Sequence, residues 1–252
     1  MRNYSKIEWT ETTWNPVTGC TKISKGCLNC YAERMAKRLA GRYGYPKDNP
    51  FQITLHPNRL FEPYKFKKHH IIFVCSMSDL FHEKVPVSYI FEILNVVKKC
   101  PQHTFQILTK RAERMFQFSL KAGSLPDNLW FGVTVEAEEY KMRIDLLRKT
   151  SASIKFLSCE PLLNDLGKIN LHNIDWIIVG GESGFNARSI KAEWVINIRN
   201  QCLNNNIPFF FKQWGGINKK KSGRYLEGKE WNQMPELKFE KKIISSQMQL
   251  AF

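Results

Sequence analysis

The sequence predicts an α/β protein built on a parallel (β/α) barrel, either partial or complete and TIM-like. Near-continuous apolar runs, rich in β-branched and aromatic residues, recur along the chain, which is typical of strands buried on both faces. Amphipathic helical patterns lie between most of these runs, as expected for repeated βα units. Because no Gly/Pro/Ser-rich linker interrupts the series, one domain is favoured over two.

The first helical pattern begins at Tyr31, where Tyr31, Met35 and Leu39 repeat at helical spacing before Gly41 or Gly44 closes it. The strand-like runs cover residues 51–56, 70–76, 104–109, 129–135, 153–159, 175–181 and 208–214. The helical patterns between them cover residues 87–99, 110–122, 138–150 and 192–206. We therefore predict one barrel domain over residues 1–216 and a basic C-terminal extension over residues 217–252.

The composition limits the classes of protein to which the chain can belong. The 252 residues are 43% hydrophobic and 13% aromatic, which supports a large core and excludes global disorder. The N-terminus lacks the apolar segment of a secretory signal, and no apolar run reaches the roughly 18 residues that span a bilayer. We expect a cytoplasmic protein with no membrane partner. In that reducing compartment, seven cysteines favour metal binding or core thiols over disulfides.

The chain is strongly basic, with 38 Lys and Arg against 23 Asp and Glu and a formal net charge of +15. A charge of this size favours a polyanionic partner, with nucleic acid as the first candidate. The alternative is a basic surface that binds no nucleic acid, because net charge reports on non-specific binding and not on fold.

Six successive predicted strands end in hydroxyl or ionisable residues. In parallel barrels these ends and the loops after them supply the catalytic groups. A helix N-cap explains single residues such as Ser78, Asp79 or Glu136, but does not explain six strands in a row. We expect the ends to meet at one cavity that holds the carboxylates and cations of Glu160, Glu182, Lys110, Arg111 and Lys212.

Three cysteines, Cys20, Cys27 and Cys30, lie within eleven positions just before the first helical pattern. A structural zinc site needs four ligands, usually in two close pairs, and this stretch has only one CxxC pair. Three thiolates instead suit an iron–sulfur cluster with one open iron, and Gly19 and Gly26 would let the loop wrap around it. The other four cysteines fall on apolar runs and are predicted core thiols: Cys75, Cys100, Cys159 and Cys202.

Several motifs carry a resemblance to a known family. The stretches "IEWTETTWNPVTGCTKISKGCLNCYAERMAKRL", "SMSDLFHE", "LTKR", "IIVGGESG" and "FFFKQWGG" resemble an uncharacterised phage-associated family known for its three-cysteine motif, over residues 7–216 or so. That family is similar in turn to radical S-adenosylmethionine (radical SAM) enzymes, including the spore photoproduct lyase-like branch. Those enzymes usually space their cysteines CxxxCxxC, so only the CxxC half of Cys20-x6-Cys27-x2-Cys30 matches.

The resemblance implies a radical SAM-type barrel, a [4Fe–4S] cluster on Cys20, Cys27 and Cys30, S-adenosylmethionine as second cofactor, and a separate partner protein. With the charge, it favours an enzyme that modifies or repairs nucleic acid. The expected cofactor contacts are Ser76, Ser78, Asp79 and Thr134, and the expected catalytic residues are Glu160, Glu182, Lys110 and Lys212. Two alternatives remain open: a zinc-stapled nucleic-acid-binding protein without catalysis, and a metal-independent barrel hydrolase that uses Glu160 and Glu182.

Overall fold

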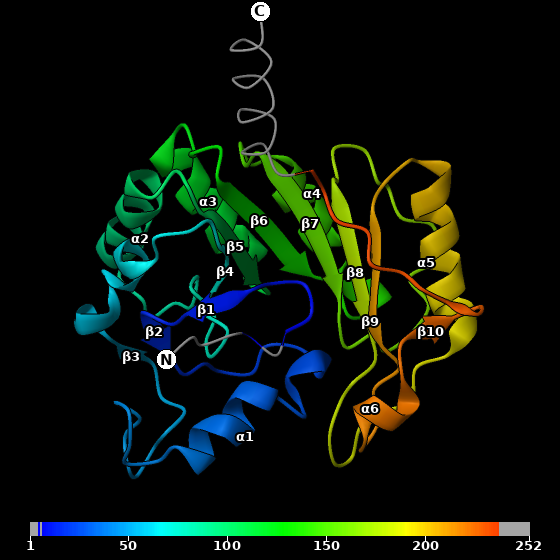
Figure 1. The fold of residues 1–252 in the computed structure, drawn as a ribbon, viewed down its shortest axis with the longest axis horizontal. Helices are drawn as coiled ribbons and strands as arrows, with labels where there is room; N and C mark the ends of the chain where they lie inside the picture. Colours follow the sequence, from blue (N-terminus) through cyan, green and yellow to red (C-terminus); the bar gives the residue numbers. More distant parts are fainter. Residues whose placement is uncertain (1–4, 6, 237–252) are drawn as a thin grey trace, which may run out of the picture.

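A computed structural model describes residues 5 and 7–236 of the chain. Its centre is a curled, seven-stranded, entirely parallel sheet in the order β1-β4-β5-β6-β7-β8-β9 (Figure 1). The strands are β1 (Thr12–Trp14), β4 (Ile71–Val74), β5 (Thr104–Thr109), β6 (Leu129–Thr134), β7 (Ile154–Cys159), β8 (Trp176–Gly180) and β9 (Phe209–Gln213). Because β1 and β9 are the two edges of this sheet, it forms a half-barrel, and the partial form of the predicted barrel is confirmed.

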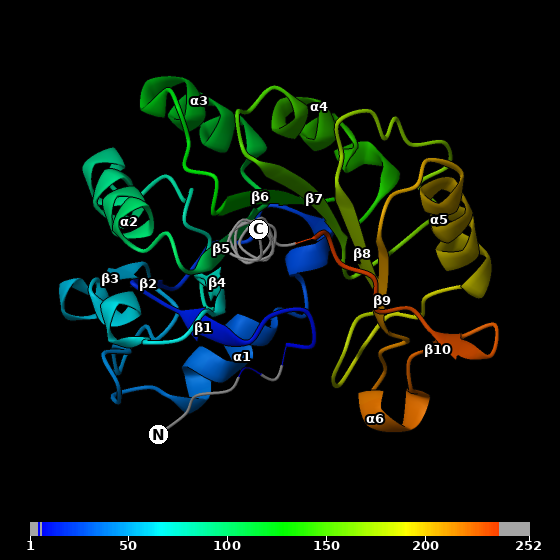
Figure 2. The ribbon, with the colours of Figure 1, turned by 45° about the horizontal axis from the view of Figure 1, so that its top comes forward.

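Helices cover the convex face of the sheet (Figure 2). They are α2 (Val87–Lys99), α3 (Ala112–Ala122), α4 (Met142–Arg148) and α5 (Ala192–Asn204), and each follows a strand as predicted. A further helix, α1 (Tyr31–Arg38), lies apart from this layer, beyond the carboxyl ends of the strands (Figure 1). Short 3-10 helices occur at η1 (Lys25–Cys27), η2 (Pro57–Arg59), η3 (Glu62–Lys65) and η4 (Glu138–Tyr140).

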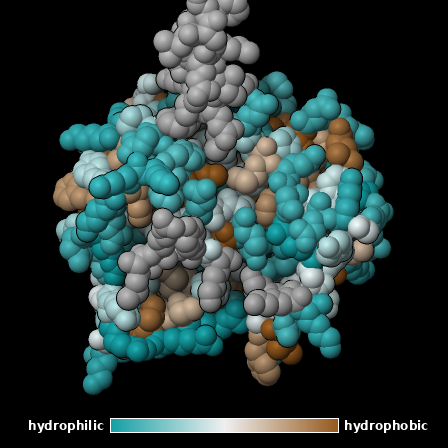
Figure 3. Space-filling view, in the orientation of Figure 1, coloured by the Kyte–Doolittle hydropathy of each residue, from teal (hydrophilic) through white to brown (hydrophobic). Residues whose placement is uncertain are grey.

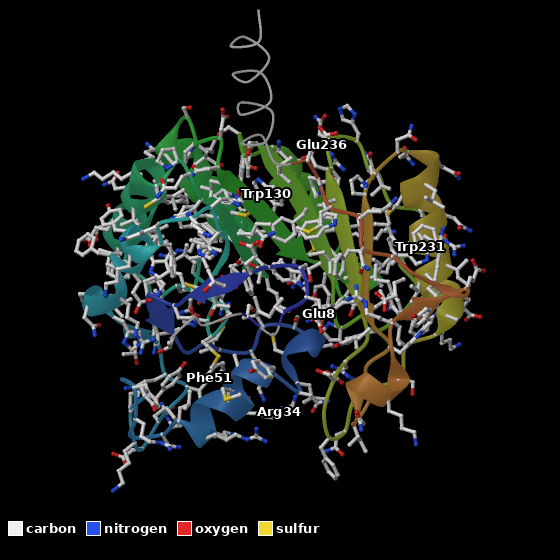
Figure 4. All side chains as sticks on the ribbon, viewed as in Figure 1. Glu8, Arg34, Phe51, Trp130, Trp231 and Glu236 are labelled. Carbon is white, nitrogen blue, oxygen red and sulfur yellow. The ribbon has the colours of Figure 1, made fainter. Side chains whose placement is uncertain are left out.

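Alternate residues of the strands face opposite sides of the sheet, and both sides are buried. In β6, Phe131 and Val133 belong to the main core under the helices, whereas Trp130 belongs to a separate cluster on the concave side (Figure 4). In that cluster Trp9 covers Phe73 and Trp176, with ring centroids 4.8 Å and 6.2 Å away. Aromatic side chains thus fill the inside of the half-barrel, which leaves the ends of the strands as the place for polar groups.

The predicted strand over residues 51–56 is wrong. Only β3 (Thr54–Leu55) forms there, and it pairs antiparallel with β2 (Val17–Thr18) outside the main sheet. Pro50 and Pro57 bracket this run, and proline cannot donate to a strand ladder. The first strand of the main sheet is instead β1, whose three residues are too few to show a period in the sequence.

The chain returns to the sheet after β9. It forms α6 (Lys219–Ser222) and a hairpin of β10 (Tyr225–Leu226) with β11 (Lys229–Glu230). The backbone N–H of Phe211 then donates to the carbonyl of Trp231 (2.9 Å), so the returning segment covers the edge of β9. The rest of the predicted extension lies outside the described residues. Within the described residues, no helix is both long and apolar enough to cross a membrane.

Candidate functional site

Residues 18–30, here called the cysteine loop, run from the end of β2 to the start of α1 along the carboxyl ends of the parallel strands (Figure 1). Cys20, Cys27 and Cys30 are all half-buried in this loop. Cys27 ends η1, and Cys30 directly precedes the first turn of α1. The loop thus holds three thiols on the side of the half-barrel where parallel barrels build active sites.

Arg111, at the start of α3, ties the first part of this loop to two strand ends. Its Nη2 donates to the hydroxyl (3.0 Å) and carbonyl (3.3 Å) of Thr21, and its Nη1 lies 3.6 Å from the Sγ of Cys20. The same guanidinium donates to Asp79 Oδ2 (3.1 Å) and Glu83 Oε1 (2.9 Å) after β4. Arg111 is almost fully buried, so its positive charge is stabilised by these two carboxylates. The same guanidinium lies next to the sulfur of Cys20.

Glu136, which follows β6, supports the middle of the loop from beneath. Its carboxylate is fully buried, accepts a hydrogen bond from Arg143 Nη1 (2.8 Å) and accepts another from the hydroxyl of Ser24. A Cβ at Gly26 would lie only 2.8 Å from Glu136 Oε1. The loop therefore packs closely on this carboxylate, and any larger residue at position 26 would have to displace it.

Glu182, which follows β8, holds the last part of the loop. It accepts hydrogen bonds from Arg188 Nε (2.9 Å) and from Asn29 Nδ2 (2.9 Å), between Cys27 and Cys30. Arg188 Nη1 in turn donates to the carbonyl of Lys25 (3.0 Å). Burial raises the pKa of Glu182, but the hydrogen bonds from Arg188 outweigh it and hold that pKa below its usual value.

Polar groups that follow β4, β5, β6 and β8 thus gather on the cysteine loop, whereas Glu160 and Lys212 pair with each other apart from it. Arg111, Glu136 and Glu182 each hydrogen-bond to this loop directly, and Asp79 is linked to it through Arg111. The explanation of Asp79 and Glu136 as helix N-caps is wrong, because neither precedes the first residue of a helix.

Glu160 and Lys212 form a separate pair on the same edge. Lys212 Nζ lies 2.8 Å from Glu160 Oε1, and their side chains are 14% and 19% exposed, so solvent reaches both. Gln213 Nε2 also approaches Glu160 Oε1, at 3.3 Å. Lys110, the remaining predicted catalytic residue, is half-buried and donates its backbone N–H to Asp79 Oδ2 (3.1 Å).

The residues predicted to contact a cofactor already have protein partners. The hydroxyls of Ser76 and Ser78 donate to Asn15 Oδ1 (3.2 Å) and to the carbonyl of Val17 (3.1 Å). Asp79 accepts hydrogen bonds from Thr109 Oγ1 (2.7 Å) as well as from the groups named above. Thr134 is buried at the end of β6. Asp79 is therefore a structural junction between β4, β5 and Arg111.

The thiols of the cysteine loop differ in acidity. Burial, helped by the negative charge of Asp79, raises the pKa of Cys20 to about 11, although Arg111 opposes this. Burial also raises the pKa of Cys27, but the backbone of Ile23, the charge of Lys110 and the hydroxyl of Ser24 outweigh it and leave that pKa lowered. The charge of Cys27 contributes to the shift at Cys20, so the two sulfurs are close enough to interact.

The remaining four cysteines are buried, which confirms them as core thiols. Within the part of the chain that the structure describes, no group of three or more His, Cys, Asp or Glu side chains is gathered around one metal position. Two histidines lie near the loop. His82 Nε2 is 2.8 Å from the hydroxyl of Thr21, and His56 Nε2 is 2.8 Å from that of Thr18.

Sequence reasoning missed three residues that hold the loop in place. Asn29 could have been suspected from its place inside the CxxC pair. Arg143 gives no sequence signal, because its partner Glu136 is seven residues away and the burial of both is a tertiary property. Arg34, labelled in Figure 4, donates from α1 to the carbonyl of Ser183 after β8 (2.8 Å).

Comparison with known proteins gives a family and no activity. A family described as "Protein of unknown function (DUF5131)" matches residues 4–235. No curated protein and no solved structure matches the chain. Because the family match covers the cysteine loop, all seven strands of the half-barrel and the return after β9, the chain belongs to the DUF5131 family.

Proposed function

We propose that this protein is an iron–sulfur enzyme of the radical SAM kind that modifies or repairs nucleic acid. In this proposal Cys20, Cys27 and Cys30 hold a [4Fe–4S] cluster, and S-adenosylmethionine is the second cofactor. The observation that carries the proposal is the placement of three half-buried thiols on one anchored loop at the carboxyl edge of a partial parallel barrel.

The three cysteines are residues of the type that binds the proposed cluster. Cysteine thiolates are the usual ligands of iron–sulfur clusters, and the loop supplies three within eleven positions. Lys110 near Cys27 helps to lower the pKa of that thiol, whereas Arg111 only partly offsets the burial that raises the pKa of Cys20. When bound, a cluster with one open iron supplies an electron and a binding position for the methionine end of the second cofactor.

The chain's own residues then divide into two groups. Arg111, Glu136 and Glu182 fix the loop, and so position the thiols. Glu160 and Lys212 are reached by solvent and pair with each other across β7 and β9, so they can bind substrate or exchange a proton at Glu160 Oε1 or Lys212 Nζ. The proposed setting is the cytoplasm, with a separate partner protein as the resemblance implies.

Metal analysis tests the proposal. Protein purified without oxygen should be brown and carry about four irons and four sulfides per chain, as a cubane cluster requires. Replacing Cys20, Cys27 or Cys30 singly by alanine should remove the iron and the visible absorption. The buried thiols are matched controls, so Cys100→Ala and Cys202→Ala should keep both. Stoichiometric zinc in colourless protein would overturn the proposal.

A second measurement tests the cofactor. On chemical reduction, the iron-loaded protein should convert S-adenosylmethionine to methionine and 5′-deoxyadenosine, with one electron supplied by the reductant and one hydrogen atom by a C–H bond of the substrate. Asp79→Ala is a poor test of cofactor binding, because it would also release Arg111. A loaded cluster that leaves the cofactor intact would restrict the protein to electron transfer or sensing.

A zinc site without catalysis is the second candidate, and one observation favours it. His82 is buried beside Thr21, the neighbour of Cys20, so a Cys3His ligand set is within reach of the loop. In that case His82→Gln should lower the zinc content of the purified protein. In the iron–sulfur case the same substitution should leave the iron content unchanged.

A further inference from the structure

Four large apolar side chains lie exposed beside the cysteine loop, and we call them the apolar rim. They are Leu28 (61% exposed), Tyr31 (59%), Phe185 (73%) and Ile217 (77%). A single exposed apolar residue is ordinary on a protein surface, but several that gather at one place mark an interaction site.

Hydrogen bonds bring the rim together from three distant parts of the chain. Asn29 Nδ2, next to Leu28, donates to the carbonyl of Asn186 (3.0 Å), next to Phe185. The N–H of Gly184 donates to the carbonyl of Gly216 (2.9 Å), next to Ile217. In Figure 3 a tan and brown protrusion stands at the lower end of the molecule, over the loop after β8.

Phe185 is exposed on a segment that its neighbours hold in place. Gly184 has a φ of +107°, and a Cβ there would lie 2.3 Å from Arg34 Nη1, so this glycine is pressed against α1. Arg34 also donates to the carbonyl of Ser183 (2.8 Å). An aromatic ring on an anchored backbone loses little conformational freedom on binding, which favours it as a contact residue.

The charge around the rim indicates what it binds. The three segments that carry it, residues 18–39, 181–193 and 214–224, contain eleven Lys and Arg against three Glu. Aromatic rings among cations are the surface that single-stranded nucleic acid uses, because bases stack on the rings and phosphates pair with the cations. The excess of positive charge favours a polyanionic partner, and the exposed aromatic rings favour one whose bases can stack on them.

We infer that the apolar rim is the contact surface for a single nucleic-acid strand, with bases stacked on Tyr31 and Phe185. The inference rests on the proposed function for the step after binding, in which the strand presents a nucleotide to the neighbouring cysteine loop. Binding itself needs no cluster, so the two proposals can fail separately.

Fluorescence anisotropy with a labelled 20-nucleotide mixed-sequence DNA strand tests the inference. Phe185→Ala should weaken binding by about 5- to 150-fold, the range for loss of one stacked base, and Phe185→Trp should restore it. Leu120→Ala and Phe61→Ala, two other exposed apolar positions, should bind like the unaltered protein. Lys221→Gln, at an exposed position close to Ile217 in the chain, should lower the slope of log affinity against log salt by about 0.7, whereas Phe185→Ala should leave that slope unchanged.

The same titration on protein with and without loaded iron separates the two proposals. If Phe185→Ala weakens binding in protein that never holds iron, the rim stands and the iron–sulfur function falls. If iron loads but Phe185→Ala binds DNA normally, or Phe61→Ala weakens it equally, the rim is not the contact surface. A third outcome would also overturn the inference: the protein does not bind DNA but forms dimers as its concentration rises, and Phe185→Ala abolishes these dimers. The rim would then be the contact surface for a second copy of the chain.

Discussion

Arg111 joins two strand ends of the site to the first part of the cysteine loop. Its buried guanidinium links Asp79, Glu83 and Thr21, and points one N–H at Cys20. Removing one partner of a buried pair costs about 3–5 kcal/mol, because the other charge stays buried. We expect Arg111→Met to lower the free energy of unfolding by about 3 kcal/mol in urea denaturation. Lys37→Met, which breaks an exposed pair with Glu33, should cost less than about 1 kcal/mol.

His56 makes stability depend on pH. Burial, with the nearby charge of Arg59, lowers the pKa of His56 from 6.5 to about 4, so the folded state keeps it neutral. As the pH falls, His56 takes up a proton in the unfolded chain at a higher pH than in the folded protein. The contribution of neutral His56 to the free energy of unfolding is therefore complete above pH 6.5 and is lost as the pH falls towards 4. We expect the unaltered protein to lose about 2 kcal/mol between pH 7 and pH 5 that His56→Gln does not lose. Equal pH profiles in urea denaturation would contradict this.

At the scale of the element, the start of the cysteine loop is fixed by Gly19. Its φ is +85°, and an added Cβ would lie 1.9 Å from the carbonyl oxygen of Gln52. Gly123, at the end of α3, also has a positive φ (+66°), but a Cβ added there would meet no atom within 4 Å. Replacing Gly123 by alanine therefore measures the backbone strain alone, without a steric clash. We expect Gly123→Ala to cost about 1–3 kcal/mol and Gly19→Ala more than that, because it adds the clash with Gln52, measured by urea denaturation. Equal costs would show that the loop yields to the clash.

At the scale of the whole molecule, the half-barrel ends in a sheet edge that the returning chain covers. Trp231 packs on Phe209 (ring centroids 5.8 Å apart) and donates its Nε1–H to the carbonyl of Leu226 (3.2 Å) (Figure 4). We expect Trp231→Ala to lower the free energy of unfolding by about 3–5 kcal/mol, as for other buried aromatic residues. Tyr225→Ala removes an exposed aromatic from the same hairpin, and it should change stability by no more than about 0.5 kcal/mol.

The sequence by itself determined six of the seven strands of the half-barrel, the helices between them and the position of the three thiols. β5 and α2 match the predicted residue ranges because a strand buried on both faces and an amphipathic helix each leave a local pattern. Only the tertiary structure decided that β1 is the first strand, and that the polar strand ends bind the cysteine loop. Arg111 is 90 residues from Thr21, and Glu182 is 153 residues from Asn29. Partners so far apart leave no local pattern, because their contact depends on how the sheet brings its carboxyl ends to one edge.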